Sequence, residues 1–171
     1  MPASELSFHE SLRASEELLS RFDNGQLGKA AFAGEAAAIL SSVSGARGFL
    51  VTLLTGEFRA ADEPAEELVE ALRGAGAVVC DLLAKNLVMS SAMAVAHERE
   101  LNYEAAAGSK RVFARTARLV QSLEIDEMRA RLEAMWLALT QGSGEYSPFL
   151  KRWQYDEEQL EQVRTAMRAF V

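Results

Sequence analysis

Apolar residues recur at spacings of three and four along most of this chain, and no segment shows the period-two alternation that marks a β-strand. The longest segment with helical spacing runs from Ala77 to about Ala107, where Gly108 kinks or ends it. Wound as a helix, this segment brings eight residues onto one face and its margin: Val79, Leu82, Leu83, Asn86, Leu87, Ser90, Met93 and His97. Good helix formers such as alanine, leucine and glutamate fill many other positions. The sequence therefore predicts an all-α fold around a long central helix.

Glycine, serine and proline divide the rest of the chain into shorter helices. The predicted segments are about 8–22, 28–43, 45–55, 63–73, 108–123, 125–140, 147–153 and 156–170. Ser7 with Glu10 forms a capping box at the first start, and Asp62 is an N-cap candidate just before Pro64. We find no internal repeat and no low-complexity linker. With 108–123 counted as the resumption of the long helix, the chain is expected to be a compact bundle of about eight helices in a single all-helical domain over residues 1–171.

The composition indicates where such a protein works. Hydrophobic residues make up 49% of the 171 positions and charged residues 25%, as in soluble globular proteins. Because Cys80 is the only cysteine, the chain can form neither an intrachain disulfide nor a cysteine-based zinc cluster. The first residues lack the features of a secretory signal, and no stretch approaches the roughly 20 apolar residues of a membrane span. We expect a cytoplasmic protein with no membrane attachment.

The candidate metal ligands are His97, Glu100 and Glu104, at positions i, i+3 and i+7 of one helix face. One imidazole and two carboxylates form a partial shell suited to iron, manganese or zinc. Carboxylate-bridged di-iron bundles repeat a Glu-x-x-His pair on two helices, whereas here the order is reversed and occurs once. A solvated face whose carboxylates pair with nearby arginines is therefore the favoured interpretation.

The candidate ligand-binding residues are Asn86, Ser90 and Met93, which lie amid leucine and methionine on the long helix. Ligand pockets combine apolar walls with a few polar anchors, as this segment does. Ordinary core packing is the favoured alternative, with the Ser90 hydroxyl bonded back to the Asn86 carbonyl. A buried asparagine would still need hydrogen-bond partners, either to fix packing or to hold a ligand.

The candidate interaction residues are a basic stripe and one aromatic side chain. Arg111, Arg115 and Arg118 occupy positions i, i+4 and i+7 of a helix, a pattern that can dock phosphate or acidic groups. A formal net charge of −7 opposes binding to nucleic acid, so pairing with acidic helices of this chain or of a partner is favoured. Trp153 is either a packed helix-junction residue, which is favoured, or an exposed anchor for a partner.

Catalytic chemistry has little support in the sequence. No base adjoins Cys80 on a helix face, and Gly74-Ala75-Gly76 lacks the third glycine and the preceding strand of a phosphate loop. No cofactor is expected. We therefore expect a non-enzymatic interaction, regulatory or assembly protein that binds a protein partner or associates with itself as a homodimer. The alternative is a ligand- or metal-binding bundle that uses the His97, Glu100 and Glu104 face.

Overall fold

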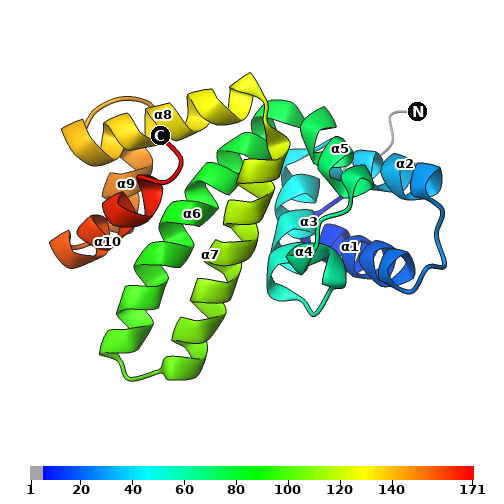
Figure 1. Cartoon of the computed structure of the whole chain (residues 1–171), viewed down its shortest axis with the longest axis horizontal. Helices are drawn as coiled ribbons and strands as arrows, with labels where there is room; N and C mark the ends of the chain where they lie inside the picture. Colours follow the sequence, from blue (N-terminus) through cyan, green and yellow to red (C-terminus); the bar gives the residue numbers. More distant parts are fainter. Residues whose placement is uncertain (1–5) are drawn as a thin grey trace. The chain divides into compact units, whose positions relative to one another are not determined.

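The computed structural model describes residues 6–171, and every regular element in that range is a helix (Figure 1). The ten helices are α1 (Phe8–Asp23), α2 (Lys29–Leu40), α3 (Val43–Thr55), α4 (Arg59–Asp62), α5 (Glu66–Gly74), α6 (Gly76–Arg99), α7 (Tyr103–Leu123), α8 (Asp126–Gln141), α9 (Ser147–Trp153) and α10 (Glu157–Met167). The prediction of an all-α chain with a long helix near Ala77 is confirmed. Residues 1–5, where the sequence predicts no secretory signal, lie outside the described range.

The chain divides into two compact helical units, residues 1–79 and 80–171. In the first unit, α1 packs along α3 at a glycine. A Cβ atom at Gly48 would lie only 2.0 Å from the Ser11 hydroxyl oxygen, so glycine is what lets the two helices approach this closely. The Ser11 hydroxyl donates to the Phe8 carbonyl at 2.7 Å and also approaches the Ser44 carbonyl at 3.1 Å. The contact therefore buries a polar group without leaving it unpaired.

The short helix α4 lies in the segment that the sequence predicts to be a loop. The Asp23 carboxylate, at the end of α1, accepts hydrogen bonds from the backbone N–H groups of Arg59 at 2.5 Å and Ala60 at 3.2 Å. This carboxylate acts as a cap supplied from another helix. The predicted N-cap role of Asp62 is wrong, because Asp62 is the last residue of α4 and α5 starts only at Glu66.

In the second unit, α6 and α7 form an antiparallel hairpin (Figure 1). The continuous helix predicted over 77–107 is therefore wrong. Leu101 adopts a left-handed conformation with φ 57°, and the Asn102 side chain accepts a hydrogen bond from the Ala105 N–H at 3.1 Å to begin α7. Gly108, the predicted break, lies inside α7. The chain turns at a capping asparagine rather than at the glycine.

Helices α8, α9 and α10 complete the second unit. The Gln159 side chain donates to the Ala92 carbonyl of α6 at 3.1 Å, and the Arg164 guanidinium donates to the Leu139 carbonyl of α8 at 3.1 Å. Asp156 and Gln159 form a capping box at the start of α10, as Ser7 and Glu10 do at the start of α1. The capping box of α1 agrees with the sequence prediction, and α10 lies in a segment that the sequence predicts to be helical.

Helix α6 is long and apolar enough to cross a membrane by length and composition, with a mean hydropathy of 1.5 over its most apolar window. The expectation that no segment meets this criterion is therefore wrong. In the structure 61% of that window is buried within the protein, as in the core helix of a soluble protein.

Candidate functional site

An apolar groove runs between the two helices of the α6–α7 hairpin, with a volume of about 340 Å³. We call it the hairpin groove and define it by its lining residues: Asn86, Met89, Ser90 and Met93 from α6, with Ala105, Gly108, Ser109 and Val112 from α7. Asn86, Ser90 and Met93, the three residues predicted to bind a ligand, all lie on its wall. The α7 wall was not predicted, because the sequence indicates a break at Gly108, whereas the chain turns before Tyr103.

Helix spacing explains why these residues meet. Each wall is made by positions i, i+3, i+4 and i+7 of its helix, which form one stripe. Met89 and Met93 of α6 line the groove together with small residues of α7, Ala105, Gly108 and Ser109. Because these α7 residues are small, a hollow remains between the helices. The Ser90 hydroxyl donates to the Asn86 carbonyl at 2.5 Å, as predicted, so Ser90 contributes little unpaired polarity to the wall.

Exposed apolar side chains continue from the groove to the turn of the hairpin. Met93 is 36% exposed, Leu101 70% and Tyr103 66%. Single exposed apolar residues are ordinary on protein surfaces, but a group next to an apolar groove is typical of an interaction site.

The three predicted metal ligands are separated by the turn between α6 and α7. His97 lies in the last turn of α6, Glu100 lies in the turn between the helices, and Glu104 lies in the first turn of α7. The His97 Nδ1 atom is 4.0 Å from a Glu100 carboxylate oxygen, and it is buried without a hydrogen-bond partner in the described chain. Across residues 6–171 no group of three or more histidine, cysteine, aspartate or glutamate side chains is placed to hold a metal ion. The geometry gives the metal hypothesis no support.

The predicted basic stripe is not one exposed surface. Arg115 is only 2% exposed, whereas Arg111 and Arg118 lie at the surface. All three have interaction partners within the protein. Because a buried guanidinium is costly without such partners, Arg115 contributes to internal packing and not to an open docking strip.

Trp153 is about half-exposed at the end of α9, and its ring stacks on Tyr155 with a centroid distance of 6.4 Å. The Tyr155 hydroxyl is buried and has no partner among the described residues, and burial raises its pKa to about 12. Trp153 is therefore both packed on a neighbouring ring and accessible from solvent, which keeps both of its predicted roles open.

A polar network that the sequence did not predict joins α6 to the start of α9. Asp81 accepts hydrogen bonds from the Tyr146 hydroxyl at 2.9 Å and from the Lys85 ammonium at 2.8 Å. The Asp81–Lys85 spacing of four residues was a visible local signal. The contact with Tyr146 spans 65 residues, so no local pattern could reveal it.

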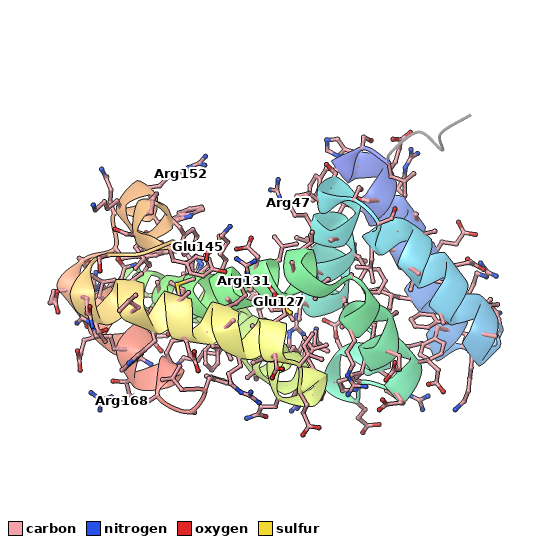
Figure 2. The ribbon with its side chains drawn as sticks, turned by 90° about the horizontal axis from the view of Figure 1, so that it is seen from above. Arg47, Glu127, Arg131, Glu145, Arg152 and Arg168 are labelled. Carbon is pink, nitrogen blue, oxygen red and sulfur yellow. The ribbon has the colours of Figure 1, made fainter. Side chains whose placement is uncertain are left out.

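Arg131 of α8 makes the neighbouring ion pairs, with Glu127 at 2.8 Å and with Glu145 (Figure 2). Burial raises the pKa of the nearby Cys80 thiol to about 11, with the Glu127 carboxylate adding a smaller repulsion. A thiol with this pKa is a poor nucleophile at neutral pH.

Comparison with known proteins identifies a family but no activity. The family described as "Uncharacterised conserved protein UCP020893" matches residues 7–170, nearly the whole chain. No curated protein matches the chain, and no solved structure does. On the extent of the family match, this chain belongs to the family of uncharacterised conserved protein UCP020893.

Proposed function

We propose that this protein is a non-enzymatic docking protein whose hairpin groove binds one amphipathic helix of a partner protein. The partner helix carries apolar side chains on one face and lysine or arginine near one end. One observation carries the proposal: an open apolar groove ends beside exposed carboxylates. We further propose that the protein acts in the cytoplasm, in keeping with its single buried cysteine.

The apolar wall suits a helix better than a small molecule. The groove is open along its length, and from Asn86 to Met93 it follows two turns of α6, about 10 Å on an ideal helix. An amphipathic helix places side chains at i, i+3, i+4 and i+7 into such a groove. Met89 and Met93 are flexible and polarizable, which lets them adapt to the side chains that enter.

The charge at the turn of the hairpin selects the partner. Glu100 is largely exposed, and its nearest ion-pair group is the His97 ring at 4.0 Å. Glu104 is also exposed and has no ion pair among residues 6–171. These carboxylates, in a chain of net charge −7, favour a cationic segment and steer its approach.

A second copy of this chain is a poorer occupant of the groove. Two copies would bring two proteins of charge −7 together, and the long-range repulsion between them opposes association. A basic helix from a different protein encounters no such repulsion.

The direct test is titration with a designed amphipathic peptide of about 18 residues, long enough to fill two turns of groove with helix on either side. Its apolar face carries leucine, and one end carries three lysines. The control peptide has glutamates in place of these lysines. We expect calorimetry to detect binding of the lysine peptide, weakened by salt, and at least tenfold weaker binding of the glutamate peptide.

Protein variants locate the binding site. Met93→Glu should weaken peptide binding at least tenfold, because it places a charge in the apolar groove. The double change Glu100→Gln and Glu104→Gln should remove most of the salt dependence. Leu137→Glu, at an exposed position on α8, is the matched control and should bind normally. Equal affinity for the two peptides, or full binding by Met93→Glu, would contradict the proposal.

Light scattering across a range of protein concentrations tests the alternative occupant. A dimer that forms in the wild-type protein and dissociates in Met93→Glu would assign the groove to a second copy and overturn the choice of a partner helix. A monomer at all concentrations is the expected result.

The metal-binding alternative has its own test. Because His97, Glu100 and Glu104 do not form a ligand group, we expect purified protein to carry no stoichiometric iron, manganese or zinc. Its melting temperature should not change when these ions are added. A stoichiometric metal ion that is lost in His97→Ala would support the metal-binding alternative after all.

A further inference from the structure

A pocket of about 360 Å³ lies among α8, α9 and α10, within the second helical unit. We call it the α9 pocket. Leu139, Leu150 and Leu160 contribute apolar wall, one from each helix. The two charged residues that line it, Lys151 and Arg164, are both cations, and no carboxylate from residues 6–171 lines it. Its volume is in the range of small-molecule sites.

The turn that ends α9 brings three unpartnered polar groups to this pocket. Within residues 6–171 the Lys151 ammonium and the Gln154 side-chain amide make no hydrogen bond or ion pair. The Tyr155 hydroxyl is buried and also lacks a partner. By contrast, the Thr140 and Ser147 hydroxyls at the same pocket donate to backbone carbonyls at 2.8 and 2.9 Å. The unpartnered groups are all hydrogen-bond donors, so together they suit an acceptor with negative charge.

Gln154 has an unfavourable backbone conformation at this turn. Its φ of 51° lies in the left-handed region, which favours glycine. Glycine would end α9 with less strain, but it would remove the amide from the pocket. Strained backbone positions of this kind cluster at binding sites. The conformation of Gln154 is therefore an indication of function that does not depend on charge.

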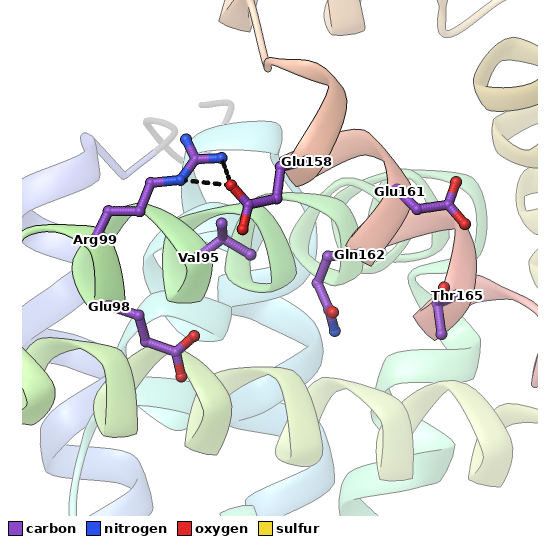
Figure 3. Close-up of a pocket in the computed structure, with 7 residues that line it drawn as sticks. All are labelled: Val95, Glu98, Arg99, Glu158, Glu161, Gln162 and Thr165. Carbon is purple, nitrogen blue, oxygen red and sulfur yellow. Dashed lines mark hydrogen bonds and ion pairs between the residues drawn. The ribbon is translucent and has the colours of Figure 1, made fainter.

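The charge of the other cation is largely offset within the protein. The Arg164 guanidinium donates to Glu157 at 2.7 Å and to Glu161 at 3.2 Å. The pocket between α6 and α10 is similar, because each of its charged residues has an ion-pair partner, as Figure 3 shows for Arg99 and Glu158. Lys151 is therefore the cation of the α9 pocket that can pair with a ligand.

We propose that the α9 pocket binds a small organic acid with an apolar body. Its carboxylate pairs with the Lys151 ammonium and accepts hydrogen bonds from the Gln154 amide and the Tyr155 hydroxyl. Its apolar body packs against the three leucines. Because the Tyr155 hydroxyl is covered in this structure, its side chain shifts when the ligand binds. This site is separate from the hairpin groove and does not depend on the docking function.

Three matched probes of the same length test the charge of the ligand by calorimetry and NMR titration. They are 4-phenylbutyrate, its neutral amide 4-phenylbutyramide, and the cation 4-phenylbutylamine. We expect the acid to bind at least tenfold more tightly than the amide, with an affinity that salt weakens, and the amine to bind most weakly. Failure of the acid to bind, or equal binding of the acid and the amide, would overturn the proposal.

A charge variant and a matched control locate the acid. Lys151→Gln should weaken the binding of 4-phenylbutyrate at least fivefold and remove most of its salt dependence. Arg152→Gln is the control, because Arg152 is the neighbouring exposed cation of α9 and does not line the pocket (Figure 2). It should bind normally. Equal effects of the two changes would show that only the general charge of α9 matters, which would overturn the proposal.

Two further variants separate a ligand contact from a structural role. Gln154→Gly relieves the left-handed strain, and Tyr155→Phe removes a hydroxyl that has no partner, so neither should lower the melting temperature. Each should nevertheless weaken acid binding about fivefold for the loss of one hydrogen bond. Lower melting temperatures with normal acid binding would assign these residues to the fold and overturn the proposal.

Trp153 gives a spectroscopic signal for the same event. Its ring stacks on Tyr155 with a centroid distance of 6.4 Å, so a shift of Tyr155 changes its surroundings. In a Trp136→Phe background Trp153 is the single tryptophan, and its fluorescence should change along the titration with 4-phenylbutyrate. Met93→Glu, which blocks the hairpin groove, should give the same titration, so failure of one proposal is distinguishable from failure of the other. Loss of acid binding in Met93→Glu would place the acid in the hairpin groove and overturn the α9 site.

Discussion

The buried Tyr146 hydroxyl donates a hydrogen bond to the Asp81 carboxylate at 2.9 Å, joining the start of α9 to α6. The other Asp81 oxygen accepts from the Lys85 ammonium at 2.8 Å, and this ammonium also lies 5.8 Å from the centre of the Tyr146 ring. Burial raises the pKa of Tyr146 well above its usual range, and the bond to Asp81 raises it further. Tyr146 is therefore a neutral hydrogen-bond donor at neutral pH.

Removing either partner of this hydrogen bond should destabilise the protein, but by different amounts. Tyr146→Phe removes the donor and should lower the free energy of unfolding by about 1–2 kcal/mol. Asp81→Ala should cost more, about 2–3 kcal/mol, because it leaves both a buried hydroxyl and Lys85 without their acceptor. Urea unfolding of both single variants and the double variant gives the coupling energy. Additive effects would show that the bond contributes nothing of its own.

The close approach of α1 and α3 predicts opposite effects for two glycine substitutions. Gly48→Ala should destabilise the protein by about 1–3 kcal/mol, because the new Cβ atom would overlap the Ser11 hydroxyl. Gly34→Ala is the matched control in α2, where a Cβ atom meets no other atom within 4 Å. It should stabilise the protein by about 0.5–1 kcal/mol through helix propensity. Chemical denaturation followed by circular dichroism measures both, and a neutral Gly48→Ala would show that the helices can move apart freely.

The Cys80 thiol should be nearly inert in the folded protein. It is fully buried, and its pKa of about 11 keeps it protonated at pH 8. We expect a thiol-specific reagent to label it at a rate set by unfolding, and to label it rapidly in urea. A control is Ser143→Cys in a Cys80→Ala background, which presents a thiol at an exposed loop position. If Cys80 in the folded protein were labelled as fast as Cys80 in urea-unfolded protein, this result would contradict its burial.

The start of α10 should lose stability in acid. The Asp156 carboxylate accepts hydrogen bonds from the Arg99 guanidinium and from the Gln159 backbone N–H at 3.0 Å, which lower its pKa to about 2. Because the pKa is lower in the folded state, its stabilising contribution is complete above about pH 4 and is lost as the pH falls through about 2. Asp156→Asn keeps an N-cap residue but removes the titrating charge. Melting temperatures from pH 5 to pH 2 should fall less steeply for this variant, and parallel curves would rule out the assignment to Asp156.

Much of the secondary structure follows from local sequence. The capping box of α1 and the backbone bond of Ser90 form as predicted, because each depends on residues three or four apart. Helix α8 buries four apolar residues at helical spacing: Met128, Leu132, Met135 and Leu139. Periodicity identifies such residues because a helix needs one apolar face whatever it packs against.

The predicted sites depended on where the helices end, and local sequence patterns did not determine the end of α6 or the start of α7. The sequence indicated a break at Gly108, but the chain turns at Leu101 and Asn102. This shift separates His97 from Glu104, and it brings α7 alongside Asn86, Ser90 and Met93 to form the hairpin groove. Local sequence does not distinguish an asparagine inside a helix from an asparagine that caps one. Only the reversal of the chain in the structure identifies Asn102 as a cap.

The sequence by itself determined that the described chain is helical, which positions face inward, and that its one cysteine forms no intrachain disulfide. Only the tertiary structure decided that Asp23 caps α4 and that Tyr146 meets Asp81. The physical reason is distance along the chain. Helix formation and capping depend on residues within about four positions, whereas grooves, cavities and buried polar pairs depend on residues brought together by packing.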